Sequence, residues 1–273
     1  MKALRLFSVF ACASLLVAAV HAQPAREFIP EVGQSGKDVV WVPTASALVN
    51  KMLDMAKATP RDYVIDLGSG DGRTVITAAK RGIKALGIEY NPDMVELSQR
   101  AAAKEGVADR ATFMKADLFE TDFSQATVIT MFLLPDINLK LRPKILNLKP
   151  GTRIVSNTFT MGEWEADETG TAGSDEGSSY YRTALLWIVP AKVDGTWTSA
   201  QGDITFRQQF QKVAGSINAG ATSTLVTGGK LRGDQISFSA GGAQYSGTVS
   251  GNTITGTAVS GGASREWSAT RTK

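Results

Sequence analysis

The fold of this chain is decided by the stretch Tyr63-Val64-Ile65-Asp66-Leu67-Gly68-Ser69-Gly70-Asp71-Gly72. Its first five residues predict a short apolar strand, the glycines predict a turn, and residues 74–81 predict a helix. In open parallel sheets, ligands bind beyond the carboxyl ends of the strands, where such a turn lies. We therefore expect this glycine turn to form part of a ligand site.

Strands and helices alternate after this stretch. Apolar and β-branched runs predict strands over residues 84–89, 111–115, 126–133 and 151–157. Periodic apolar residues predict helices over residues 45–57, 91–105 and 139–146. Together they predict an α/β domain over residues 41–190, with a doubly wound, mostly parallel, Rossmann-like sheet and right-handed crossovers. The apolar run over residues 180–190 predicts a late, antiparallel strand.

The character of the sequence changes after residue 190. Glycine pairs separate short β-branched and aromatic runs, which predict an antiparallel meander or small barrel over residues 191–273. The expected strands cover residues 203–212, 215–218, 223–226, 235–239, 243–249, 253–258 and 265–271. Trp197 and Trp267 are expected to pack at one end of a barrel similar to the lipocalin type. This region carries no recognisable site chemistry, so we expect it to contact a partner or the α/β domain.

The first 22 residues have the pattern of a secretory signal. Lys2 and Arg5 precede an apolar run over residues 6–20, and a cleavage site follows Ala22. This predicts an exported protein, periplasmic or secreted, with no membrane span after cleavage; a retained N-terminal anchor is the alternative. Residues 23–40 are expected to be a polar tether.

Composition excludes several kinds of chemistry. Among 273 residues, Lys+Arg 29 against Asp+Glu 26 gives a net charge of +3, too small to indicate a nucleic-acid partner. The single cysteine, Cys12, and the single histidine, His21, both lie in the predicted signal. A disulfide framework, a cysteine-based metal site and a histidine-based triad are therefore excluded, and no metal is expected.

Acidic residues surround the predicted ligand site. Asp66 and Asp71 flank a Gly-x-Gly-x-Gly turn, which lacks the Gly-x-Gly-x-x-Gly spacing of dinucleotide sites and suits a cationic ligand. This spacing disfavours a nicotinamide-dependent oxidoreductase. Glu89 ends the next strand, where a carboxylate can accept hydrogen bonds from a ribose diol. Asp117-Leu118 follows the third strand, where the carboxylate can bind an adenine amino group and the leucine can pack on the ring.

This set of residues resembles the class I S-adenosylmethionine-dependent methyltransferases over residues 41–190. The resemblance implies S-adenosyl-L-methionine as cofactor. The cofactor-binding residues that it implies are Asp66, Gly68, Ser69, Gly70, Glu89, Asp117 and Leu118.

Four shorter motifs are similar to a subgroup of protein-lysine methyltransferases that includes the mitochondrial ATP-synthase c-subunit lysine methyltransferases. They are Val42-Pro43-Thr44, Gly70-Asp71-Gly72-Arg73, Leu133-Leu134-Pro135 followed by Leu139-Lys140-Leu141-Arg142, and Gly162-Glu163-Trp164. The similarity implies in-line transfer of a methyl group to a protein lysine. The predicted export signal and the C-terminal β-domain depart from that subgroup.

The substrate side of the site is less well defined. Residues expected to line it are Pro43, Phe132, Pro135, Asn157 and Glu163. Asp136 and Trp164 are the catalytic candidates; Trp164 either holds an ammonium by cation–π attraction or anchors a surface loop. Residues 163–179 are expected to form a lid or a solvated linker. The sequence has no Asn-Pro-Pro-Tyr motif after the fourth predicted strand, so it gives no indication that a nucleic-acid base is methylated. The alternative function is an exported, non-catalytic binding or scaffolding protein.

Overall fold

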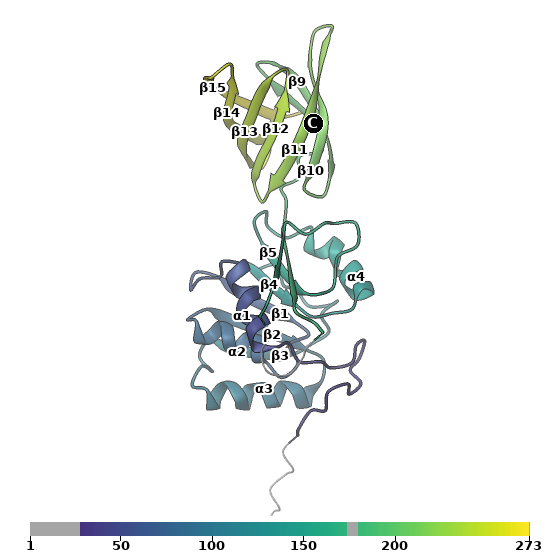
Figure 1. Cartoon of the computed structure of the whole chain (residues 1–273), viewed down its shortest axis with the longest axis vertical. Coiled ribbons are helices and arrows are strands. Elements are labelled where there is room, and N and C mark those ends of the chain that lie inside the picture. The colour runs from purple at the N-terminus through teal and green to yellow at the C-terminus, as the bar shows by residue number, and fades with distance from the viewer. Residues whose placement is uncertain (1–27, 174–179, 273) are drawn as a thin grey trace, which may run out of the picture.

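The computed structural model describes residues 28–173 and 180–272, which form an α/β domain and a β-barrel (Figure 1). The predicted signal peptide lies outside the described residues, as do residues 174–179 at the end of the segment expected to be a lid or linker. Among the helices in the described ranges, none has the length and apolar character needed to cross a bilayer.

The α/β domain is built on one seven-stranded sheet. Its strands are β1 (Tyr63–Leu67), β2 (Lys84–Glu89), β3 (Ala111–Lys115), β4 (Val128–Met131), β5 (Arg153–Asn157), β6 (Glu168–Thr171) and β7 (Thr183–Ile188). They follow the order β3-β2-β1-β4-β5-β7-β6. The first five are parallel, β7 pairs antiparallel with β5, and β6 pairs antiparallel with β7. The prediction of a mostly parallel, doubly wound sheet with a late antiparallel strand is confirmed.

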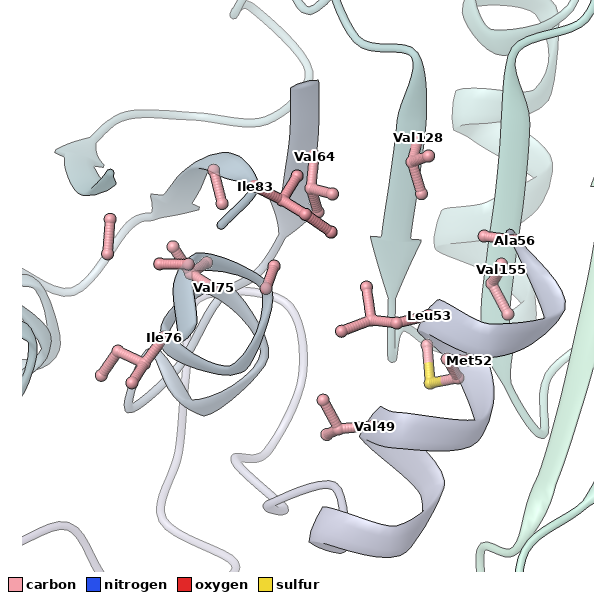
Figure 2. Close-up of a cluster of buried hydrophobic side chains, with 14 of the residues drawn as sticks. Val49, Met52, Leu53, Ala56, Val64, Val75, Ile76, Ile83, Val128 and Val155 are labelled. Carbon is pink, nitrogen blue, oxygen red and sulfur yellow. The ribbon is translucent and has the colours of Figure 1, made fainter. Parts of the chain in front are cut away.

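Helices cover both faces of this sheet. They are α1 (Ser46–Met55), α2 (Arg73–Lys80), α3 (Pro92–Lys104) and α4 (Pro135–Ile145). Consecutive strand residues point to opposite faces: Val64 packs with α1, α2 and α3, and Ile65 packs with α4. Figure 2 shows Met52 and Leu53 of α1 beside Val128 and Val155 of the sheet. Because both faces of the central strands β1, β4 and β5 are buried, these strands have nearly continuous apolar runs.

Two parts of the α/β domain differ from the predictions. Helix α4 begins at Pro135 rather than near Leu139, because a proline fits the first turn of a helix, where its missing N–H needs no partner. Within the segment predicted as a lid or linker, Glu168–Thr171 forms strand β6 at the edge of the sheet. The side chains of β6 are mostly exposed, so this strand shows no apolar alternation in the sequence.

The C-terminal domain is a closed barrel of eight strands. They are β8 (Gly195–Ser199), β9 (Gly202–Gln209), β10 (Lys212–Ala219), β11 (Thr222–Arg232), β12 (Gln235–Ala240), β13 (Ala243–Ser250), β14 (Thr253–Ser260) and β15 (Ala263–Arg271). Each strand pairs with the next one along the chain, and β15 pairs with β8. Trp197 and Trp267 are both buried in the barrel core, where the Trp267 ring contacts Phe238 and Tyr245. The predicted antiparallel domain is confirmed.

Two predicted boundaries within the barrel are wrong. The strand expected over residues 203–212 is split by a turn at Phe210-Gln211, where Phe210 has a φ of 54°. Gly228-Gly229, one of the glycine pairs expected to separate strands, lies within β11, where the register with β12 shifts between Thr227 and Lys230. Such a bulge needs a residue that tolerates an irregular backbone, so glycine marks it as readily as it marks a turn.

The barrel lies against the sheet edge opposite the carboxyl ends of the parallel strands. Ile188, the last residue of β7, pairs with Arg153, the first of β5, so the chain leaves the sheet at that edge (Figure 1). There the Phe210 ring stacks on Trp164 with centroids 6.0 Å apart. Gln211 Nε2 donates to the Glu165 carbonyl at 2.8 Å. The barrel is thus fixed to the α/β domain without approaching the predicted ligand site.

Candidate functional site

A pocket lies at the carboxyl ends of the central strands. Its wall contains every residue predicted to bind the cofactor, together with two of those predicted to line the substrate site: Asp66, Gly68, Ser69, Gly70, Glu89, Asp117, Leu118, Pro43 and Phe132. The carboxyl ends of parallel strands meet at one edge, which brings together residues from distant parts of the sequence.

Glu89 connects the end of β2 to the glycine turn. Its Oε2 accepts a hydrogen bond from the Gly70 N–H at 2.9 Å, and its Oε1 accepts one from the Asn91 N–H at 2.9 Å. A carboxylate oxygen can accept more than one hydrogen bond, so both oxygens keep capacity for further donors. The two backbone contacts therefore hold the carboxylate in place in the pocket wall and leave it able to bind two hydroxyl groups.

The glycine turn needs glycine at its last position. Gly72 has a φ of 78°, in the left-handed region, and is the N-cap residue directly before helix α2. A Cβ atom at this position would lie 2.7 Å from the Phe113 ring and 2.8 Å from Cβ of Ser98. Both the backbone conformation and the close contact with neighbouring side chains exclude larger residues.

Gly72→Ala is expected to lower the free energy of unfolding by about 1–2 kcal/mol more than Gly106→Ala does, since overpacking adds a cost of this order. Gly106 is the matched control, because its φ is 68° but a Cβ there would meet nothing within 4 Å. Both variants carry the same left-handed backbone penalty. Urea unfolding of the two proteins checks the difference, and equal destabilisation would mean that Phe113 and Ser98 move aside without cost.

Asp66 is a buried carboxylate in the pocket wall, 6% exposed. Burial raises its pKa from the usual 3.8 to about 7, and the neighbouring charges of Asp71 and Glu89 also raise it. The Thr130 hydroxyl donates to Asp66 Oδ1 at 2.6 Å. Within the described part of the chain, the buried Ser69 Oγ has no hydrogen-bond partner. The pocket therefore suits a positively charged group with hydrogen-bonding atoms.

Residues 34–44, called here the pocket strap, form another wall of the pocket. Lys37 forms an ion pair with Asp117, and its Nζ lies 4.8 Å from the centroid of the Tyr90 ring. The hydrogen bond from Lys37 lowers the pKa of Asp117 below its usual value. Trp41 Nε1 lies 2.6 Å from where a Cβ of Gly70 would be. Most of the strap had been expected to be a polar tether, and only its end, Val42-Pro43-Thr44, carried a sequence signal.

The other predicted substrate residues and the catalytic candidate Asp136 lie outside the pocket wall. Pro135 and Asp136 are exposed at the start of α4, and Glu163 is exposed in the loop before β6. Asn157 is buried, and its Nδ2 donates to Thr44 Oγ1 at 3.2 Å. This hydrogen bond connects the end of β5 to the strap.

Trp164 does not have the placement that a substrate-binding role requires. Its side chain is fully buried, with ring centroids 6.3 Å from Trp187 and 6.0 Å from Phe210. Because these rings lie at the edge where the barrel attaches, Trp164 cannot contact an ammonium group in the pocket. The cation–π expectation is therefore corrected: Trp164 anchors its loop and the barrel.

Comparison with known proteins matches the ANTKMT methyltransferase domain family to residues 66–168. A protein-lysine N-methyltransferase of Saccharolobus islandicus is 46% identical over 154 residues, which cover 55% of this chain and 94% of that protein. The ATP-synthase c-subunit lysine N-methyltransferase of Rattus norvegicus is 35% identical over a match that covers 53% of this chain and 67% of that protein. A crystal structure described as an RNA methyltransferase from Salinibacter ruber, in complex with S-adenosyl-L-homocysteine, is 44% identical and has a TM-score of 0.51. The match covers 56% of this chain and 96% of that chain. The chain therefore belongs to the class I S-adenosylmethionine-dependent methyltransferases, in the family that includes these protein-lysine N-methyltransferases.

Proposed function

We propose that this chain transfers a methyl group from S-adenosylmethionine to the Nζ atom of a lysine in a protein. The observation that carries the proposal is the 46% identity to the protein-lysine N-methyltransferase of Saccharolobus islandicus. The match covers 94% of the length of that protein. The rat relative, named for a lysine of the ATP-synthase c-subunit, supports the same acceptor atom. The barrel lies outside the family match, so the particular acceptor protein need not be shared.

The pocket fits the cofactor in charge and in hydrogen-bonding groups. Glu89 would accept the ribose hydroxyls, and Asp117 would accept the adenine amino group in competition with Lys37. Gly68 and Gly70 would lie against the amino-acid part. The buried Asp66 carboxylate adds a negative charge that a cationic amino-acid group can pair with.

When bound, S-adenosylmethionine supplies a methyl group that is activated by its attachment to a sulfonium. The lone pair of a neutral lysine nitrogen would attack this methyl group in line as the carbon–sulfur bond breaks. The products would be S-adenosylhomocysteine and, after loss of a proton to solvent, methyllysine. The residues of the chain need to orient the amine, exclude water and position negative charge. Because the cofactor is already activated, neither a histidine nor a cysteine is required.

The test supplies the purified protein with methyl-tritiated S-adenosylmethionine and a mixture of cell-extract proteins and RNA. We expect the label in methyllysine after acid hydrolysis of the protein fraction, and its loss in the Glu89→Ala variant. Label that ribonuclease releases would instead identify RNA as the acceptor, as in the description of the Salinibacter ruber structure. Cofactor binding without label in either fraction would support the non-catalytic alternative.

We also propose that the chain is exported to the periplasm or secreted, on the basis of the signal pattern in residues 1–22. Cleavage after Ala22 would leave the pocket strap in the mature protein. Mass spectrometry of protein from fractionated cells is expected to find an N-terminus at Gln23 outside the cytoplasm. Protein that begins at Met1 in the cytoplasmic fraction would contradict export.

A further inference from the structure

Three aromatic side chains meet beside the pocket: Phe132, Phe159 and Tyr181, called here the aromatic trio. The Phe132 ring centroid lies 5.8 Å from that of Phe159 and 5.0 Å from that of Tyr181, and the last two are 5.8 Å apart. All three side chains are half-buried. Among the described residues, the two apolar cores of the α/β domain do not include them. Core packing therefore does not explain why these rings are gathered here.

The backbone that carries Phe159 is strained. The Phe159 N–H donates to the Asn157 carbonyl at 2.7 Å, two residues back, and Thr158 between them has a φ of 62°. A γ-turn with a positive φ at a β-branched residue is rare and costs energy. Strain of this kind persists only where the surrounding structure enforces it, and it gathers at functional sites.

Neighbouring groups enforce this conformation from two sides. The Ser156 hydroxyl donates to the Phe159 carbonyl at 2.8 Å, and Asn138 Nδ2 of α4 donates to the Thr160 carbonyl at 3.1 Å. The Thr158 N–H donates to the Thr183 carbonyl at 2.7 Å, which connects this turn to the start of β7. The ring of Phe159 is thereby held against Tyr181, which precedes β7.

The trio lies at the same edge of the sheet as the pocket. Phe132 follows the end of β4 and belongs to the pocket wall, and its ring contacts Phe159 and Tyr181, so this residue joins the two features. Phe159 follows the end of β5, and the start of β7 pairs with that end through Asn157 and Ala184. The three rings are thus a partly exposed aromatic surface that continues the pocket.

We propose that the aromatic trio binds the side chain of the acceptor lysine, with its methylenes and its ammonium or methylammonium group against the rings. This inference rests on the proposed function, because it assigns a place to the acceptor of that reaction. Aromatic faces attract cations, and they also pack against apolar chains. A lysine side chain offers both, whereas an RNA base offers no cation.

The same rings serve the chemistry of the transfer. Positive charge moves from sulfur to nitrogen as the carbon–nitrogen bond forms, so a cation-attracting surface at the nitrogen stabilises the transition state more than the neutral amine.

The test uses two small probes on the protein saturated with S-adenosylhomocysteine. One probe is Nα-acetyl-Nε-trimethyllysine methylamide, and the other is its neutral isostere with carbon in place of the quaternary nitrogen. We expect the wild-type protein to bind the cationic probe about tenfold more tightly in NMR titrations, within the range of a cation–π contact. Phe159→Leu and Tyr181→Leu should each remove most of this preference, whereas Tyr181→Phe, which keeps the ring, should retain it.

The matched control is Tyr180→Leu, which alters the neighbouring residue, 95% exposed, and should leave the preference unchanged. Calorimetry with S-adenosylhomocysteine shows whether each leucine variant still folds and binds cofactor, and only variants that do are compared. Equal affinity of the wild-type protein for the two probes would overturn the inference, as would an undiminished preference in both leucine variants. Failure of the wild-type protein to bind S-adenosylhomocysteine would instead contradict the proposed function.

Discussion

Replacing Glu89 with alanine is expected to weaken the binding of S-adenosylmethionine by about 100-fold or more, since hydrogen bonds to a charged group contribute about 1.5–3 kcal/mol each and 1.4 kcal/mol corresponds to a factor of ten. The Glu89 carboxylate is held in the pocket wall by the N–H groups of Gly70 and Asn91. The substitution removes the expected acceptor for the ribose hydroxyls. It also releases the glycine turn, so the remaining contacts become less well positioned.

Isothermal titration calorimetry with S-adenosylmethionine measures this loss. The matched control is Glu96→Ala, which removes an exposed carboxylate on helix α3 outside the pocket and should leave the affinity unchanged. Thermal unfolding should show that the α/β domain of the Glu89→Ala variant remains folded. An unchanged affinity in a folded Glu89→Ala variant would show that this carboxylate does not contact the cofactor.

Asp66→Asn is expected to stabilise the protein at pH 8 while weakening cofactor binding. Between pH 3.8 and about 7, the folded protein keeps a proton on Asp66 that the unfolded chain releases. Stability therefore falls as the pH rises through this window, and above it the folded protein retains a buried charge at full cost. At 1.36 kcal/mol per pKa unit, removing the carboxylate adds at most roughly 4 kcal/mol at pH 8 and progressively less at lower pH.

Urea unfolding at pH 5 and pH 8 tests this expectation. Asp109→Asn, which changes an exposed carboxylate in a loop, is the control and should show no comparable gain at pH 8. Equal effects of Asp66→Asn at the two pH values would mean that Asp66 is ionised in the folded protein at both. Below pH 7, binding of the cationic cofactor to the wild-type protein should also release a proton, which calorimetry in buffers of different ionisation enthalpy detects.

The gathering of the predicted cofactor residues around one pocket could be predicted because their signals are local. The glycine turn, Glu89 and Asp117-Leu118 each follow a strand, and the parallel topology brings the ends of such strands to one edge. Their approximate placement therefore required only the order of the elements. The unpartnered Ser69 hydroxyl and the raised pKa of Asp66 depend on burial in three dimensions, which the sequence does not state.

The features that sequence reasoning missed depend on contacts between distant segments. The pocket strap is polar and rich in glycine, like a linker, and acquires its structure from partners such as Asp117 and Tyr90. The residues around Trp164 in the sequence do not indicate whether its side chain faces a substrate or the barrel. Phe210 occupies a turn without glycine because its ring packs on Trp164, a contact between two domains. Phe159 and Tyr181 belong to no motif, although Phe159 follows a predicted strand and Tyr181 lies within one.

The ring of barrel strands is completed by its shortest ladder, in which Ala269, Thr270 and Arg271 of β15 pair with Ser199, Thr198 and Trp197 of β8. Hydrogen bonds from Arg271 to the carbonyls of Lys192 and Asp194, and from Thr272 to Thr196, reinforce this seam. Backbone amides along the seam should exchange with deuterium sooner than those between β13 and β14, because short ladders open at lower free energy. A truncation that removed β15 would leave the backbone hydrogen-bonding groups of β14 and β8 unpaired at two open edges. Exposed strand edges of this kind promote aggregation.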